Sequence, residues 1–273
     1  MSTTALTAEL ANRRTPIPRR PRLVSAELLK LRKRRGLVAS GLALTVLPMV
    51  VAYTILLIVH AANPAKHGPA GGLQNFSDSI DLLMTLSVVA AILIGSTLGA
   101  SDLSSGVFRE LVVTGRSRLA LFAARVPAGL ALLWTFVGAG FAVTALASQV
   151  FAGSLHPPAL ALVAETAAWL ALVSGFSLVL ALAVSSIIGS RGTAIGVLVA
   201  WQIVVTPLLL QIKALGTLRE LLVGAATERL RPGTLIGSPT EVRMSIAAAA
   251  VALLAWTIVA LALGAWRTVT RDA

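Results

Sequence analysis

The chain has 273 residues, of which 56% are hydrophobic and only 12% are charged, and its mean hydropathy is +0.87. Soluble domains carry about 25% charged residues, so this composition excludes an ordinary soluble fold. The net charge of +12 does not indicate a nucleic-acid partner, because ten of the 23 basic residues lie between Arg13 and Arg35, directly before the first long apolar run. The absence of cysteine excludes disulfides, thiolate metal sites and cysteine nucleophiles.

Six stretches without acidic or basic residues are long enough to cross a bilayer. A hydrocarbon core about 30 Å thick needs roughly 20 helical residues at 1.5 Å each. The sequence therefore predicts an all-α integral membrane protein with six transmembrane helices near residues 37–60, 82–100, 121–147, 161–188, 193–212 and 244–266. Kinks are expected in the first, third and fifth of these at Pro48, Pro127 and Pro207.

An even number of spans places both termini on one side of the membrane. With the N-terminus inside, the inner segments hold 17 Lys and Arg residues and the outer segments hold 6. Because basic residues favour the cytoplasmic side, we expect both termini to be cytoplasmic. The segment Lys213–Arg243 is the one exception to this rule, because it is basic and yet is assigned to the outer side.

Two regions differ in composition. Residues 1–22 are rich in Pro and Arg and have too little apolar content to order themselves, so they predict a disordered basic tail. Residues 23–273 are predicted to form a single domain, the six-helix transmembrane domain. No segment between the spans reaches the usual size of a separate domain.

The stretch Leu23–Arg35 carries apolar residues at Val24, Leu28 and Leu31, with basic residues gathered towards its C-terminal end. This spacing predicts an N-terminal amphipathic interfacial helix that lies on the inner leaflet and bends into the first span at Gly36. A basic tail that only sets the topology is the alternative interpretation.

The sequence holds no pattern for nucleotide or metal chemistry. None of the four lysines follows a glycine, which the Gly-Lys-Ser/Thr element of a phosphate-binding loop requires. His60, His67 and His156 fall at predicted outer ends of helices or in loops, without the paired spacing of metal ligands. We therefore expect no metal, no cofactor and no enzymatic activity in this chain.

Charged residues are almost absent from the predicted spans. Asp78 and Asp81 are expected to cap the start of the second span, and Glu165 to lie near the start of the fourth. Arg125 is near the inner end of the third span, from which its side chain is expected to reach the lipid headgroups. The pattern disfavours both a membrane hydrolase built on paired acids and proton-coupled transport through buried carboxylates.

Small and polar residues inside the spans suggest where helices pack. The pairs in Gly95–Gly99 and Gly192–Gly196 let helices approach closely, and internal packing is favoured over a subunit interface at both. Gln202 and Gln211 are the best polar candidates for a substrate path in the fifth span. An interhelical hydrogen bond is the alternative role for these two amides.

The connection Ser101–Arg118 joins the second and third spans. Gly106 and Gly115 bracket a short stretch with apolar pairs at i,i+4 spacing, and Arg109 and Glu110 occupy its more polar side. Such a helix would rest on the membrane and present its charges to the cytoplasm. A plain connector with solvated charges explains the same residues equally well.

These two cytoplasmic segments together resemble the permease subunits of ABC type-2 transporters. That family has a Glu-Leu-x-Lys-Leu-rich helix before the first span, and the matching residues here are Glu27, Leu28, Lys30 and Leu31. The family pattern between the second and third spans is matched by Asp102, Gly106, Arg109, Leu111, Ser117 and Arg118. The six-helix layout with a long outer segment before the last span also agrees, so the resemblance covers nearly the whole chain.

The resemblance implies a multi-pass permease of the bacterial cytoplasmic membrane that exports a hydrophobic or amphipathic substrate. It implies that a separate ABC ATPase subunit docks on the second connection, where the expected coupling residues are Asp102, Gly106, Arg109, Glu110, Arg116 and Arg118. A second permease chain, identical or homologous, would complete the substrate path among the membrane lipids. The outer segment before the last span is expected to form short re-entrant or outer helices.

Two other classes of function remain open at this point. A secondary transporter or a membrane-integral assembly factor would need no ATPase, and an intramembrane enzyme ranks third because acids and histidines are scarce in the spans. An apolar path suits lipids, peptides and hydrophobic drugs equally.

Overall fold

The computed structural model describes residues 20–104, 117–233, 235 and 244–270. Throughout these ranges the regular elements are helices. Six of them are long and apolar enough to cross a membrane, namely Arg35–Ala62, Gly72–Ala100, Arg118–Val150, Leu160–Ile188, Arg191–Gln211 and Ile246–Thr270. The prediction of an all-α membrane protein with six spans is confirmed.

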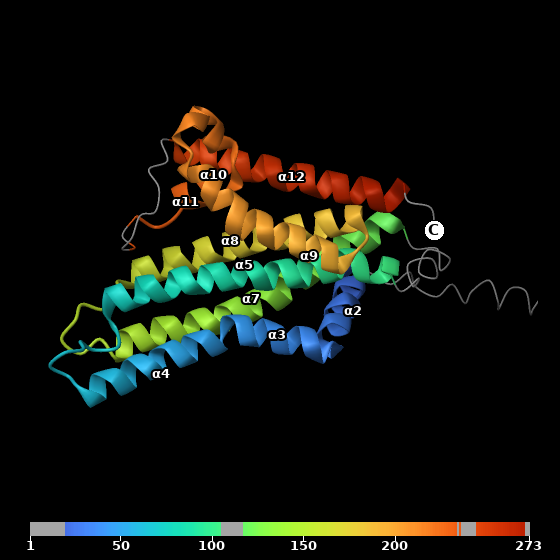
Figure 1. The fold of residues 1–273 in the computed structure, drawn as a ribbon. Coiled ribbons are helices and arrows are strands. Elements are labelled where there is room, and N and C mark those ends of the chain that lie inside the picture. The colour runs from blue at the N-terminus through green and yellow to red at the C-terminus, as the bar shows by residue number, and fades with distance from the viewer. Residues whose placement is uncertain (1–19, 105–116, 234, 236–243, 271–273) are drawn as a thin grey trace, which may run out of the picture.

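The long helices run side by side and the chain reverses direction at each connection (Figure 1). One end of the bundle carries α2 (Arg20–Lys33), the end of α12 (Ile246–Thr270) and the start of α7 (Arg118–Val150); we call it the terminal end. The opposite end, here called the distal end, carries the α4–α5 and α7–α8 connections together with α10 and α11.

The predicted amphipathic helix is present as α2. A break at Arg34, with φ −79° and ψ 83°, separates it from α3 (Arg35–Thr45). Leu31 is buried, and Val24 and Leu28 pack partly buried against the same core. Helix α2 packs chiefly on α7, so its apolar face contacts the helix bundle, while Leu29 on the other side is exposed.

Two neighbouring helices, α5 (Gly72–Ser104) and α8 (Leu160–Ile188), form the centre of the bundle. A Cβ added at Gly95 would lie 2.5 Å from the backbone oxygen of Leu178, so the two backbones are in close contact there. The packing role predicted for Gly95–Gly99 is therefore confirmed. The same prediction is wrong for Gly192–Gly196, where a Cβ at either glycine would meet no described atom within 4 Å.

The prolines act differently in the three spans that hold them. The first span is interrupted at Val46, and α4 (Leu47–Ala62) begins with Pro48 in its first turn. Helix α7 runs without interruption through Pro127. The fifth span is irregular before Pro207, with α9 (Arg191–Val199), a π-helical segment η1 (Ala200–Val205) and α10 (Thr206–Gln211) following in order.

Among the described residues between the fifth and sixth spans, two short helices lie at the distal end. A 3₁₀ segment, η2 (Lys213–Leu221), is followed by α11 (Val223–Arg229). Arg229 Nε donates to the backbone oxygen of Met244 at 2.6 Å, and Trp256 Nε1 donates to that of Leu221 at 3.1 Å. These bonds hold the short helices against α12 and the residue Met244 that precedes it.

Candidate functional site

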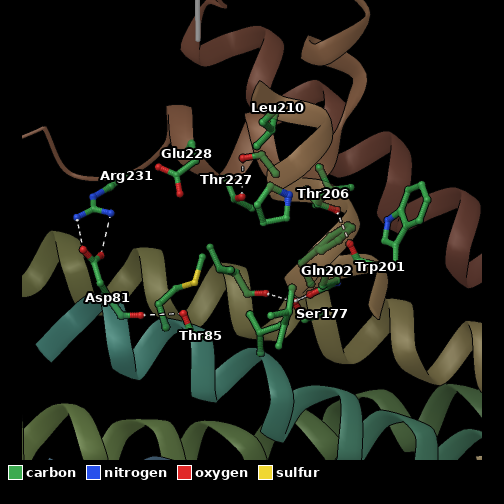
Figure 2. Close-up of a pocket in the computed structure, with 18 of the residues that line it drawn as sticks. Asp81, Thr85, Ser177, Trp201, Gln202, Thr206, Leu210, Thr227, Glu228 and Arg231 are labelled. Carbon is green, nitrogen blue, oxygen red and sulfur yellow. Dashed lines mark hydrogen bonds and ion pairs between the residues drawn. The ribbon is translucent and has the colours of Figure 1, made fainter. Parts of the chain in front are cut away.

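A cavity of about 460 Å³ lies between α5, α8, the fifth span and α11 (Figure 2). Pockets for small molecules typically measure about 300–1,000 Å³, so one drug-sized ligand fits this volume. Apolar side chains from all four segments make much of its wall, among them Met84, Val88, Val173, Phe176, Leu180, Ile203, Leu210 and Val223.

The cavity extends from the distal end towards the middle of the bundle. Asp81 lies about 14 Å along α5 from Gly72, at 1.5 Å per residue. Ser177 lies about 26 Å along α8 from Leu160 on the same basis. Both residues line the cavity. Helix α8 has 29 residues and is about 42 Å long on the same basis, so Ser177 lies a little past its middle. A ligand in the cavity would therefore reach from the level of Asp81 to near mid-depth of the bundle.

A hydrogen bond between two helices forms the polar part of the cavity near mid-depth. Ser177 Oγ lies 3.0 Å from the backbone oxygen of Val173 and 3.2 Å from Oε1 of Gln202, and its one proton is shared between these acceptors. The amide nitrogen of Gln202 makes no hydrogen bond with any residue that the structure describes, so it is available to a ligand. Gln211, at the end of α10, lines the cavity as well.

The π-helical segment positions Gln202. Pro207 has no backbone N–H, so it cannot donate to Ile203, and the regular i,i+4 pattern fails there. The Thr206 N–H instead donates to the backbone oxygen of Trp201, and Thr206 Oγ1 donates to the same oxygen at 2.9 Å. The wider turn leaves the Gln202 amide pointing at Ser177 (Figure 2).

An ion pair stands at the distal mouth of the cavity. Arg231 contacts both carboxylate oxygens of Asp81, with Nη1 to Oδ1 at 2.8 Å and Nη2 to Oδ2 at 3.1 Å. The Arg231 side chain is only 9% exposed, whereas that of Asp81 is 47% exposed. The arginine also lies over the Trp169 ring at 5.9 Å, and Trp169 Nε1 donates to the backbone oxygen of Thr227 at 2.9 Å. These contacts fasten the segment after α11 to α5 and α8.

The position of Asp81 corrects a prediction. Asp78 and Asp81 were expected to cap the second span near residue 82, but α5 already begins at Gly72. Asp78 accepts hydrogen bonds from Gln74 on the helix surface, and Asp81 binds Arg231 across the cavity mouth. Both acids therefore belong to the body of α5 rather than to its N-terminus. Hydrogen bonds or an ion pair with other side chains stabilise their charges there.

Glu228 is the third charged residue at the mouth. Burial raises the pKa of its carboxyl above the usual 4.5, and neighbouring Asp81 raises it further, against the opposing effect of Arg231. Its carboxylate makes no hydrogen bond with any described residue. Since Arg231 balances one acid only, the three side chains together carry one negative charge when Glu228 is ionised.

The sequence did not single out Arg231 or Glu228. Both lie in Lys213–Arg243, which stood out only as a basic segment on the side predicted to be outside. The excess of basic residues in this segment does not identify Asp81 as the partner of Arg231, since 150 residues separate the two. The only local signal of a charged site was that Arg231 lies close in sequence to Glu228.

Most of the predicted coupling residues, Gly106, Arg109, Glu110 and Arg116, lie outside the described residues. The remaining two belong to helices: Asp102 to the last turn of α5 and Arg118 to the start of α7. Arg118 Nη1 donates to the backbone oxygen of Val269 at 3.0 Å, which joins α7 to α12 at the terminal end.

Other predicted residues act within the protein. Glu27 and Lys30 form an ion pair of 3.4 Å on α2, close to the buried Leu31 and partly buried Leu28. Arg125 was expected to reach the headgroups, but it is only 2% exposed, so its side chain is buried within the protein. That prediction is wrong.

The cavity groups suit binding and orientation of a ligand: an amide, hydroxyls and a carboxylate among apolar walls. In the part of the chain that the structure describes, no group of three or more His, Asp or Glu residues is placed to hold a metal ion. His60, for instance, uses Nδ1 for a 2.8 Å hydrogen bond with the backbone oxygen of His67.

The chain matches no known family model and no curated protein.

Proposed function

We propose that this protein is the transmembrane permease subunit of an ATP-binding cassette exporter of the bacterial cytoplasmic membrane. The observation that carries the proposal is the cavity, which lies towards the distal end and reaches near mid-depth of a six-span bundle. Its apolar walls with a few polar groups fit a hydrophobic or amphipathic substrate. In the resemblance, ATP is hydrolysed by a separate subunit, and this chain has no phosphate-binding loop of its own.

The layout of the bundle supports the expected position of the ATPase. The α5–α7 connection joins helices at the terminal end, where α2 and the end of α12 also lie (Figure 1). The excess of Lys and Arg in the segments of this end favours the cytoplasm. An ATPase at the terminal end would therefore face the cavity through the bundle, with α5 leading from the coupling connection to Asp81.

The orientation is tested by labelling single cysteines in intact cells, since the native chain has none. Gly153 lies exposed at the distal end and Ser190 lies exposed at the terminal end, so they form a matched pair. An impermeant maleimide should label Gly153→Cys and spare Ser190→Cys until the cells are opened. The reverse pattern would place the termini outside.

The partner is tested by purifying the tagged chain from its native membrane. We expect an ABC ATPase to co-purify, together with a second permease chain, in a complex whose mass native mass spectrometry gives. Arg109→Glu and Glu110→Arg should weaken ATPase retention or uncouple hydrolysis from transport. Arg191→Glu, at the start of α9 next to the other connection of the terminal end, serves as control. Normal transport and ATPase binding in both loop variants would make this loop a plain connector.

One observation favours a second candidate, a secondary transporter without an ATPase. Asp81 and Glu228 line the cavity together, although the sequence disfavoured carboxylates in a transport path. Burial raises the pKa of Glu228 above its ordinary value, as is expected of a carboxyl group that takes up a proton during transport. Transport in vesicles that persists without nucleotide and stops when the proton gradient is collapsed would support this candidate and contradict the first.

A further inference from the structure

We propose that the cavity binds a lipophilic organic cation, whose positive charge pairs with Glu228 at the distal mouth and whose apolar body lies between α5, α8 and the fifth span. That this ligand is a transported substrate rests on the proposed export function. The inference narrows the substrate to one chemical class. The site itself is defined by the side chains of the cavity.

The charge at the mouth is the first step of the argument. Asp81 and Arg231 neutralise each other through two short contacts. Glu228 lines the same mouth and has no hydrogen-bond partner among the described residues. Figure 2 shows its side chain extending from α11 over the open space above α5 and α8. An ionised carboxylate half-buried in that position gains most from a ligand cation.

An anion would be a poorer ligand. Its best partner in the cavity would be Arg231, whose guanidinium is held by the Asp81 carboxylate and covered by the Trp169 ring. Binding an anion there would require breaking this pair and would bring the ligand charge close to Glu228. The electrostatic balance therefore selects for positive charge.

The apolar walls select for the rest of the ligand. Below the mouth the cavity is lined by Met84, Val88 and Phe176, with Leu210 opposite. A strongly hydrated cation without an apolar body would lose its water and gain little from these side chains. Near mid-depth the free amide nitrogen of Gln202 can donate to one acceptor on the ligand. The predicted ligand is thus cationic at one end and apolar along its length.

The test uses two probes of matched shape and opposite charge, tetraphenylphosphonium and tetraphenylborate. Binding of each radiolabelled probe is measured on the full-length protein in phosphatidylcholine nanodiscs, which carry no net charge. We expect the wild type to bind the phosphonium more tightly than the borate, after subtraction of binding to empty nanodiscs. Equal or preferential binding of the borate, or no binding of the phosphonium, would overturn the proposal.

The matched variants are Glu228→Gln and Glu165→Gln. Glu165 is exposed on α8 and does not line the cavity. Removing one carboxylate charge that pairs with the ligand should lower phosphonium affinity roughly tenfold for Glu228→Gln. Glu165→Gln should leave it unchanged. Equal affinities of wild type and Glu228→Gln would place the cation elsewhere and overturn the site.

Failure of this site is distinguishable from failure of the proposed function. Phosphonium binding to the chain alone, without ATP-driven export by its complex, would support the site and overturn the export function. ATP-driven export of other compounds by a chain that does not bind the phosphonium would support the export function and overturn the site.

Discussion

Helix α5 forms two contacts of opposite character. Against α8 it is tight: Gly95 brings the backbones together, and two-thirds of the apolar window in each of these helices is buried. Across the cavity, α5 faces the fifth span, where only 17% of the window is buried and an open volume of about 460 Å³ remains. Small residues that face each other close a helix pair, whereas the π-helical segment η1 lies beside the open volume.

The largest expected effect comes from filling the tight contact. Gly99→Leu would force a side chain against the backbone oxygen of Leu182, which a Cβ alone already approaches to 2.5 Å. Overpacking a core costs about 1–3 kcal/mol and more where backbone blocks the space, so we expect loss of most folded protein. Fluorescence-detected size exclusion and thermal unfolding in detergent measure this.

Gly196→Leu is the matched control, because a Cβ there meets no described atom within 4 Å. It should fold and melt like the wild type. If Gly196 instead lies at an interface between two copies of this chain, Gly196→Leu should shift native mass spectra from dimer to monomer at unchanged thermal stability. Equal destabilisation by both variants would contradict the contrast between the two contacts of α5.

The second effect concerns the ion pair that closes the mouth of the open contact. Asp81→Asn removes the negative charge that both Nη atoms of the 9% exposed Arg231 contact, whereas Arg231→Met leaves a carboxylate that is 47% exposed and can reach water. We therefore expect Asp81→Asn to lower stability more, by about 1–3 kcal/mol once solvent screening is allowed for. A larger loss for Arg231→Met in thermal unfolding would show that the arginine acts by packing on Trp169 rather than by its charge.

How far the sequence predicted these contacts depends on how local their causes are. The positions of the spans followed from hydropathy, because about 20 apolar residues form a local signal. The start of α5 did not, because Asp78 and Asp81 ended the apolar window while their partners made the helix continue to Gly72. Gln202 and Gln211 were identified as rare polar residues in a span, and both line the cavity.

The remaining cavity residues needed the tertiary structure. Arg231 and Glu228 acquire their role only when α11 folds back over α5, which no local pattern encodes. Arg125 likewise has the residue type and the position of a headgroup-facing arginine, and its burial became visible only in the tertiary structure. Helix signals are short-range, whereas the partner of a charge is set by topology.

The third effect is the pH dependence of cation binding. A lipophilic cation binds the ionised carboxylate of Glu228, so affinity should fall as pH is lowered through the pKa of this group. Because burial and Asp81 raise that pKa above 4.5, the fall should begin at a higher pH than for an exposed glutamate, with Arg231 working against the shift. Tetraphenylphosphonium binding measured from neutral pH down to below 4.5, the ordinary pKa of a glutamate, tests it.

The same raised pKa has a consequence for folding, which provides the control. The folded state holds the proton more tightly than the unfolded chain, so the stabilisation is complete below pH 4.5 and is lost as pH rises through the folded pKa. Glu228→Gln should therefore remove the pH dependence of phosphonium binding and be slightly more stable than wild type at neutral pH. A wild-type binding curve that is flat across this range would exclude Glu228 as the titrating group.

The smallest effect is expected from the hydrogen bond that spans the open contact at mid-depth. Interhelical hydrogen bonds in membranes average about 0.6 kcal/mol, so Ser177→Ala and Gln202→Leu should each lower stability by less than about 1 kcal/mol. In a double-mutant cycle the double variant should lose less stability than the sum of the two single losses, because each variant removes the same 3.2 Å contact. Ligand binding separates the two roles of Gln202. If its amide only joins α8 to the fifth span, both variants should change the affinity for an acceptor-bearing cation equally. If its nitrogen also donates to the ligand, Gln202→Leu should lower that affinity further than Ser177→Ala does. Tetraphenylphosphonium has no acceptor, so both variants should then change its affinity equally.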